Sequence, residues 1–293
     1  MSECTWEYDY IRHDLLADIP NIDSEIINGG NISNLLHRQP GQPTIMALTC
    51  RTDFTTVLQV VKHIKPLIIF INSDEVGHAM EWQSLQNHTK LLLRQYNHKP
   101  YQYEPNNIHI PLGYASGYLH KRTSFEMQPL KATTDRSINC TFIGEQKYDR
   151  THMSNVFKAN MEKTNIDFVI TNWSDSEKQT YHPSKLFDIY KDTIFIPNGR
   201  GNSVNCFRVY EAIIAGAIPV IVGEMADTQH MFTFHNGKIP CVYAENWESA
   251  VATCNSLLTQ PEKLQDMQTS LIRWYNETID GIRQLIQKNI QEQ

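Results

Sequence analysis

A chain of 293 residues that is 41% hydrophobic and 20% charged can build one large or two medium domains with buried cores. Its formal net charge of −6 argues against a nucleic-acid groove as the main function, because such a groove needs a basic surface. The N-terminus lacks the basic start and the apolar core of a signal peptide, and no apolar run approaches the ~20 residues of a membrane span. These features predict a soluble, cytoplasmic protein without a membrane span.

Cysteine-rich and metal-binding motifs are missing from the sequence. The six cysteines are scattered without a C-x-x-C pair, which is typical of small buried side chains in a reducing compartment. Neither H-E-x-x-H nor D-x-D occurs. We therefore expect no metal cofactor.

The first part of the chain alternates apolar runs with amphipathic segments. Residues 1–43 have mixed polarity and several turn signals, which predict a lead-in helix and loops. Strands are then expected at Thr44–Thr49, Leu67–Ile71, Lys90–Arg94 and Ile108–Pro111. Helices are expected at Phe54–Ile64 and Ala79–Asn87. This alternation predicts a parallel α/β domain.

A second α/β domain is expected after the polar stretch Lys121–Ser137, which we interpret as an interdomain linker. Its strands are predicted at Cys140–Ile143, Asp167–Thr171, Thr193–Ile196, Ile218–Val222 and Pro240–Ala244. Its helices are predicted at residues 150–163, Pro183–Lys191, Val204–Ala215 and Trp247–Leu258. A last helix from Pro261 toward Gln287 is long enough to cross back to the first domain. The predicted domains are residues 1–130, with a returning helix at about 266–293, and residues 131–265.

The segment Thr193–Val222 is the most informative stretch, because it predicts a strand, a glycine-rich turn, a helix and a strand. The turn contains Gly199 and Gly201, and Asn202 or Ser203 is placed to cap the helix. The N-terminus of such a helix carries unpaired N–H groups and partial positive charge, so it favours a phosphate. The incomplete G-x-G pattern also leaves a Rossmann-type NAD(P) oxidoreductase open.

Arg208 and Glu211 lie three positions apart on one face of this predicted helix. A cation near the turn and a carboxylate one turn further suit a nucleotide diphosphate, with the arginine on phosphate and the glutamate on sugar hydroxyls. The spacing alone favours a surface Arg–Glu pair on an amphipathic helix.

The order of several motifs resembles the exostosin-like glycosyltransferases. Their C-terminal signature is matched by Pro197-x-Gly199, by Arg208-x-x-Glu211-Ala212-Ile213 and by Gly216-Ala217-Ile218-Pro219-Val220. The R-x-Y and I-P-L-G motifs of the xylosyltransferases in this family, and the turn on their phosphate side, resemble Arg94-Gln95-Tyr96, Ile110-Pro111-Leu112-Gly113-Tyr114, and Phe142-Ile143-Gly144 with Arg150. The likeness covers roughly residues 67–225. Family members often place Ser before the Arg, whereas Phe207 stands here and leaves the role of Ser203 open.

The resemblance implies a GT-B fold, in which two Rossmann-like, doubly wound parallel-sheet domains face a central cleft. It implies an acceptor domain at the N-terminus and a nucleotide-sugar domain after it. The compact form, without an anchor, is similar to the chlorovirus β-xylosyltransferases of the capsid N-glycan core, which implies a viral enzyme. No nucleic-acid partner is expected.

The activity that the resemblance implies is inverting, metal-independent transfer of a sugar, most simply xylose from UDP-xylose, to a glycan hydroxyl with a β-linkage. The expected partners are the nucleotide-sugar donor and an oligosaccharide or glycoprotein acceptor, and the resemblance implies the fucose of an N-glycan as the acceptor. Donor and acceptor rest on the resemblance alone. An inactive nucleotide- or carbohydrate-binding module is the alternative outside enzymes.

The resemblance also assigns residues to sites. The expected donor-binding residues are Gly144, Arg150, Asn172, Trp173, Gly199, Ser203, Arg208 and Glu211. The expected cleft residues on the acceptor side are His78, Arg94, Tyr96, Gly113 and Tyr114. A partly buried core tryptophan remains the alternative for Trp173, and a surface pair remains the alternative for Arg94 and Tyr96.

Inverting transfer needs a base to accept the proton of the acceptor hydroxyl. Asp74 follows a predicted buried strand and is the first candidate, with Glu75 and then His78 behind it. An unpaired carboxylate in a closed cleft would have a raised pKa, which suits a base near neutral pH. The alternative is that Ser73, Asp74 and Glu75 only cap a helix.

Overall fold

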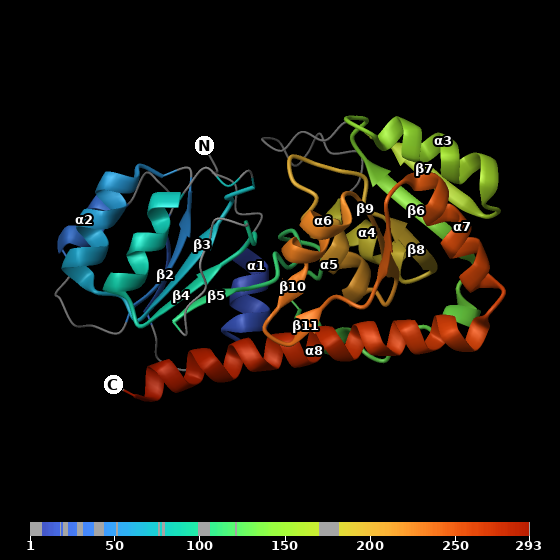
Figure 1. Ribbon diagram of the computed structural model, residues 1–293. Coiled ribbons are helices and arrows are strands. Elements are labelled where there is room, and N and C mark those ends of the chain that lie inside the picture. The colour runs from blue at the N-terminus through green and yellow to red at the C-terminus, as the bar shows by residue number, and fades with distance from the viewer. Residues whose placement is uncertain are drawn as a thin grey trace. The chain divides into compact units, whose positions relative to one another are not determined.

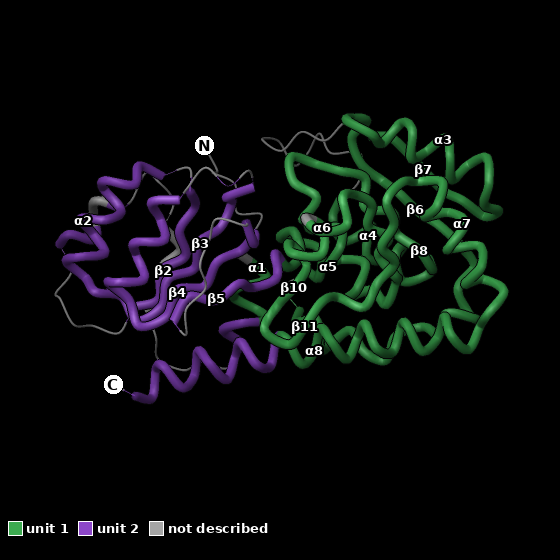
Figure 2. Tube along the Cα trace, in the orientation of Figure 1, with its two compact units in different colours: residues 1–14, 113–278 green, residues 15–112, 279–293 purple. Residues whose placement is uncertain are grey.

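The computed structural model describes residues 8–17, 19, 23–27, 32–37, 44–50, 52–75, 77, 80–98, 106–120, 122–169 and 182–292 (Figure 1). The chain forms two compact units (Figure 2). Unit 1 contains Met1–Asp14 and Gly113–Thr278, and unit 2 contains Leu15–Leu112 and Ile279–Gln293. Within the described ranges, no helix combines the length and the apolarity needed to cross a membrane.

Unit 2 is built on a parallel five-stranded sheet whose strands follow one another in chain order. These strands are β1 (Asp23–Ile27), β2 (Thr44–Thr49), β3 (Ile68–Asn72), β4 (Leu91–Arg94) and β5 (Asn107–His109). The helical connections are η2 (Ile32–His37), α2 (Phe54–Ile64) and η3 (Met80–His88). Strand β1 was not predicted, because residues 1–43 show no clear periodicity.

The core of unit 2 lies between this sheet and its helical connections. Helix α2 begins where Asp53 accepts a hydrogen bond from the Thr56 backbone N–H at 2.8 Å, and it ends at Lys65 in a left-handed cap. Alternate strand residues and one face of each helix form a single buried cluster, which includes Met46, Leu48, Val57, Val61, Ile69, Ile71, Trp82 and Leu92. Burial of this surface holds the helices on the sheet.

Unit 1 also contains a parallel five-stranded sheet, in the spatial order β7, β6, β8, β9, β12. These strands are Thr164–Phe168, Ile138–Gly144, Thr193–Pro197, Ile218–Val222 and Val242–Ala244. Its longer helices are α3 (Arg150–Asn160), α4 (Pro183–Tyr190), α5 (Phe207–Ile214), α6 (Met225–Met231) and α7 (Trp247–Leu258).

Smaller elements complete unit 1. They are α1 (Tyr8–Tyr10), the following π-helical turn η1 (Ile11–Leu15), the 3-10 turns η4 (Phe125–Met127) and η5 (Thr133–Asp135), and the hairpin of β10 (Thr233–Phe234) and β11 (Gly237–Lys238). The last helix, α8 (Pro261–Gln291), contributes residues 261–278 to unit 1 and residues 279–291 to unit 2.

The strand order of unit 1 reverses at β6. This strand pairs with β7, the next strand in the chain, on one side and with β8 on the other. Helices α3 and α7 contact each other, and so do α4 and α5. In open parallel sheets, ligands bind beyond the carboxyl ends of the two strands at such a reversal. The ends of β6 and β8 therefore define where a ligand site is expected.

Two predicted boundaries are wrong for identifiable reasons. The helix expected from Val204 begins at Phe207, because the preceding loop is closed by side-chain hydrogen bonds of Asn198. The strand expected at 167–171 pairs with β6 over Thr164–Phe168 instead. The predicted α/β class with two parallel sheets is confirmed.

The chain passes between the units at Leu112–Gly113, not within the predicted linker. Residues 122–137 lie in unit 1, where Ser124 N donates to the buried Asp14 carboxylate at 2.8 Å and Thr133 N donates to Gln265 at 2.9 Å. These bonds join segments more than 100 positions apart, so the local polarity of this stretch does not reveal them.

Candidate functional site

Glycines stand where the two central strands of unit 1 end. Gly144 is the last residue of β6, and a Cβ atom there would lie 2.8 Å from Nη2 of Arg208. Gly199 follows β8, and a Cβ atom there would lie 2.8 Å from Cγ of Arg150. The absence of side chains at both strand ends therefore lets two arginine side chains approach the backbone closely.

The two arginines converge on one aromatic ring. Cζ of Arg208 lies 4.3 Å from the centroid of Phe142, and Cζ of Arg150 lies 5.3 Å from it. Nη2 of Arg208 donates to the Ile143 carbonyl at 3.2 Å, and Nε of Arg150 donates to the Gly199 carbonyl at 3.2 Å. The carbonyl groups at the strand ends thus hold both guanidinium groups at the reversal point.

No carboxylate neutralises this pair of cations among the described residues, because the ion pairs found within 4.0 Å all involve other side chains. Arg150 is 5% exposed, and burial together with the nearby charge of Arg208 lowers its pKa to about 10. Nε of Arg208 is buried without a hydrogen-bond partner. Two close guanidinium groups at the start of helix α5 provide charge and donors for an anion.

The loop between β8 and α5 is held by its own side chains. Asn198 donates through Nδ2 to the Val204 carbonyl at 2.6 Å and accepts from Sγ of Cys206 at 2.7 Å. Oγ of Ser203 accepts from the Asn205 N–H at 3.2 Å. The N-cap residue of α5 is Cys206, so the prediction that Asn202 or Ser203 caps this helix is wrong.

Glu211 is buried, with 5% of its surface exposed. Its Oε1 accepts from the Ala115 N–H at 3.2 Å, and its backbone carbonyl accepts from the Tyr118 hydroxyl at 2.8 Å. Burial raises the pKa of this carboxyl to about 7, although the bond from Ala115 and the charge of Arg208 act in the opposite direction. The alternative of a surface Arg208–Glu211 pair is therefore wrong.

Gly113 and Tyr114, which were expected in a cleft, have packing roles in unit 1. Gly113 has φ +76°, and a Cβ atom there would lie 2.2 Å from the ring of Tyr10. Tyr114 is 1% exposed, and its ring stands edge-on to Tyr10 with centroids 5.9 Å apart. Burial and the nearby Asp14 carboxylate raise the pKa of Tyr114. Only a glycine fits this backbone position.

In unit 2, Asp74 lies beyond the end of β3 and is 4% exposed. Its Oδ2 accepts from Nη2 of Arg94 at 3.3 Å, and Arg94 is fully buried. The expectation of an unpaired carboxylate at Asp74 is therefore wrong. Ser73 just before it has φ +67°, an unusual conformation for a residue other than glycine.

The remaining predicted residues are placed as follows. Glu75 is half-buried beside Asp74, and Tyr96 is buried with φ +61° and stacks on His98 with ring centroids 6.3 Å apart. His78, Asn172 and Trp173 lie outside the described residues. In the described ranges, no group of three or more His, Cys, Asp or Glu side chains is placed to hold a metal ion.

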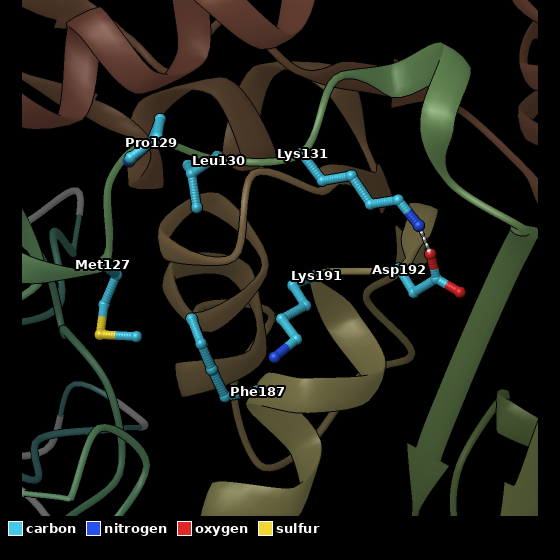
Figure 3. Close-up of a pocket in the computed structure, with 7 residues that line it drawn as sticks. All are labelled: Met127, Pro129, Leu130, Lys131, Phe187, Lys191 and Asp192. Carbon is cyan, nitrogen blue, oxygen red and sulfur yellow. Dashed lines mark hydrogen bonds and ion pairs between the residues drawn. The ribbon is translucent and has the colours of Figure 1, made fainter.

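A separate pocket of about 480 Å³ in unit 1 is lined by Met127, Pro129, Leu130, Lys131, Phe187, Lys191 and Asp192 (Figure 3). Lys131 pairs with Asp192, and Lys191 pairs with Asp188 at 2.7 Å. Because carboxylates already neutralise its cations, this pocket is less suited to an anion than the end of β6.

Sequence reasoning missed two residues of the site at β6 and β8. Phe142 stood within a recognised motif, but its place beneath both guanidinium groups depends on the packing of α3 and α5. Asn198 was interpreted as part of a turn, although an asparagine directly after a buried strand is a known signal for side-chain hydrogen bonds to nearby backbone.

Comparisons with known proteins address the family. No curated protein matches the chain. Solved structures with limited similarity include an α1,3-fucosyltransferase (9% identity, 95% of this chain and 95% of that chain, TM-score 0.44). They also include a DNA-modifying β-glucosyltransferase, with 14% identity over 92% of this chain and 98% of that chain and a TM-score of 0.40. The T4 phage enzyme in complex with its UDP-glucose substrate has 13% identity over 92% of this chain and 98% of that chain, with a TM-score of 0.37.

The family model named RXYLT1 C-terminal domain matches residues 120–293, which is more than half of the chain. The matched region contains the two guanidinium groups, both strand-end glycines and Glu211. The predicted resemblance to exostosin-like enzymes is thereby confirmed, and the chain belongs to the RXYLT1 C-terminal domain family of glycosyltransferases.

Proposed function

We propose that this protein is an inverting glycosyltransferase that moves xylose from UDP-xylose to a glycan hydroxyl without a metal ion, forming a β-linkage. The observation that carries the proposal is the pair Arg150 and Arg208, converging on Phe142 where the strand order reverses, with no carboxylate partner among the described residues. A diphosphate supplies the negative charge that this arrangement lacks.

The same groups account for departure of the leaving group. Transfer places growing negative charge on the diphosphate, and fixed cations and helix N–H groups stabilise it. Arg150, Arg208 and the start of helix α5 take that role in the proposal. Glu211, the fifth residue of α5, is assigned to the ribose hydroxyls, which donate hydrogen bonds to a carboxylate.

The proton acceptor is assigned to Asp74 or Glu75, at the carboxyl end of β3. Asp74 is held by Arg94, which fixes the position of its carboxylate. Glu75 is more exposed and belongs to the same turn. His78 remains the third candidate.

The name of the family and the resemblance of its motifs support xylose as the sugar. The fucose of an N-glycan as acceptor, a viral origin and a cytoplasmic location stay predictions from the sequence. The absence of a metal requirement also stays a prediction from the sequence. Treatment of the active enzyme with EDTA would test it.

The decisive experiment is calorimetric titration of the whole chain with UDP, UDP-xylose, UDP-glucose and NAD, followed by an assay for release of xylose from bound UDP-xylose. We expect binding of UDP and UDP-xylose, release or transfer of the sugar, and no binding of NAD. Tight NAD binding without UDP binding would instead support an oxidoreductase. Binding of UDP-xylose without turnover under any acceptor would support an inactive binding module.

A further inference from the structure

Two asparagine side chains in the described part of the chain are buried with neither polar atom hydrogen-bonded. They are Asn72 in unit 2 and Asn205 in unit 1, and each is 1% exposed. A buried amide without hydrogen bonds destabilises a fold, so such a group calls for a specific explanation.

Asn205 lies in the loop between β8 and α5, three positions before Arg208. Two other polar side chains of this loop are bonded: Asn198 to Val204 and Cys206, and Ser203 to the Asn205 N–H. Nε of Arg208 also lacks a partner among the described residues. The unbonded Asn205 amide and the unbonded Nε of Arg208 therefore lie three positions apart in the chain, in the segment where the donor is proposed to bind.

We propose that the Asn205 side chain binds hydroxyl groups of the transferred sugar of the donor, an inference that rests on the proposed function. A carboxamide both donates and accepts hydrogen bonds. Phosphate oxygens only accept, so a phosphate would leave Oδ1 of Asn205 unpaired. A sugar hydroxyl donates and accepts, and two neighbouring hydroxyls satisfy both ends of the amide.

The spacing along the chain agrees with this assignment. Glu211, Arg208 and Asn205 follow at intervals of three, and helical residues rise about 1.5 Å each, so the first interval spans about 4.5 Å. The donor has the same order of parts: ribose, diphosphate, sugar. If Glu211 faces the ribose and Arg208 the diphosphate, Asn205 lies on the side of the sugar.

Because Asn205 is enclosed, the sugar reaches it only when the surrounding loop moves. Gly199 and Gly201 lie in this loop, and Arg200 and Asn202 are exposed. Binding of a sugar nucleotide is therefore expected to rearrange residues 199–204, whereas binding of UDP alone is not.

The test compares Asn205→Leu with the matched control Asn72→Leu, because both remove an unbonded amide and keep a branched side chain. Calorimetry gives the Kd of UDP, UDP-xylose and UDP-glucose for each variant, and thermal unfolding gives Tm. For Asn205→Leu we expect about a tenfold loss in affinity for the sugar nucleotide that the wild type binds, with UDP affinity within about twofold. Asn72→Leu should leave both affinities unchanged.

Other outcomes would overturn the inference. Equal loss of UDP and sugar-nucleotide affinity would place Asn205 on the uridine or the diphosphate. If neither affinity changes, Asn205 has no role in donor binding, while UDP binding by the wild type would leave the proposed function standing. If Asn205→Leu does not fold, as Tm will show, Asn205→Ala provides the same ratio. Failure of the wild type to bind any uridine nucleotide would instead reject the proposed function.

Discussion

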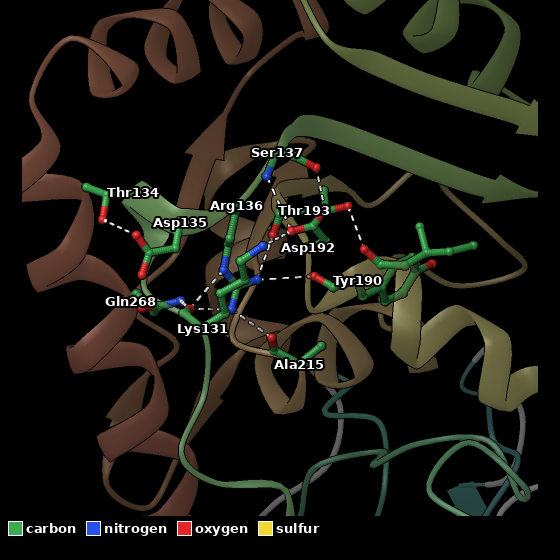
Figure 4. A network of polar contacts seen from close by, with 11 residues as sticks. Lys131, Thr134, Asp135, Arg136, Ser137, Tyr190, Asp192, Thr193, Ala215 and Gln268 are labelled. Carbon is green, nitrogen blue, oxygen red and sulfur yellow. Dashed lines mark hydrogen bonds and ion pairs between the residues drawn. The ribbon is translucent and has the colours of Figure 1, made fainter.

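Two arginines of unit 1, Arg136 and Arg208, differ in how their N–H groups are used. All five N–H groups of Arg136 donate to backbone carbonyl groups, at 2.7–3.1 Å, and these belong to Lys131, Tyr190, Thr193 and Ala215 (Figure 4). Arg208 donates to Ile143 and to Sγ of Cys206, and its Nε has no partner among the described residues.

The difference separates a structural arginine from one suited to a ligand. Arg136 joins the segment before β6, the end of α4, the start of β8 and the end of α5, so its hydrogen-bonding capacity is exhausted. Burial lowers its pKa to about 10. Arg208 has an N–H group at Nε that is not hydrogen-bonded among the described residues, and it lies beside a second cation, Arg150. Both arginines are partly or fully buried, so burial alone would not distinguish them.

The largest effect is expected in unit 2, where a third arginine, Arg94, faces a carboxylate instead of carbonyl groups. Removing a general base costs ~10²–10⁴-fold in rate and leaves donor binding intact. We therefore expect either Asp74→Asn or Glu75→Gln to lose transfer by that factor at unchanged UDP affinity. Steady-state assays and calorimetry measure the two quantities.

Unfolding curves of both variants are the control for this prediction, because Asp74→Asn also breaks a buried ion pair. If both variants keep near-normal transfer, the base lies elsewhere, with His78 next. If both lose only stability, the turn after β3 was a helix cap.

Arg136→Ala should be the most destabilising change in unit 1. Four carbonyl groups lose a charged donor, and the expected loss is about 4 kcal/mol in the free energy of unfolding. Urea titration measures it, with the exposed Arg273→Ala as the matched control. A loss below about 1 kcal/mol would show that Arg136 is not the structural member of the comparison.

Glu211 should make stability depend on pH. Its folded pKa of about 7 lies above the ordinary glutamate value of 4.5, so between these pH values the folded state holds a proton that the unfolded state has lost. The contribution of Glu211 to the free energy of unfolding is therefore fully present below pH 4.5 and falls by about 3 kcal/mol as pH rises to 7. The difference between wild type and Glu211→Gln, in urea titrations at pH 5 and pH 7.5, should show this change. An equal difference at both pH values would contradict it.

Arg208→Ala should weaken UDP binding by ~1.5–3 kcal/mol, which is about 10- to 150-fold, because a charge-assisted hydrogen bond to phosphate is lost. Unlike Arg136→Ala, it should change the free energy of unfolding little. Calorimetry with UDP and uridine separates a phosphate contact from a nucleoside contact, and Arg273→Ala again serves as control. Equal weakening of uridine would remove Arg208 from the phosphate.

Sequence patterns located most elements because those patterns are local. The apolar run within Thr44–Thr49 predicted β2, and helical patterns predicted α2 and α7 at their observed bounds. Strand β1 was not predicted, because its position depends on pairing with β2 rather than on its own composition. Local periodicity says little about which residues lie at a shared edge.

The sequence by itself therefore determined the α/β class, the parallel strands and the family motifs that contain Arg150, Arg208 and Glu211. Only the tertiary structure decided which polar groups are already bonded. The donors of Arg136 reach Ala215, 79 positions away, while Glu211 accepts from Ala115, 96 positions away, and Asp74 pairs with Arg94. A side chain's remaining hydrogen-bonding capacity depends on such distant partners, and spacing along the chain does not encode them.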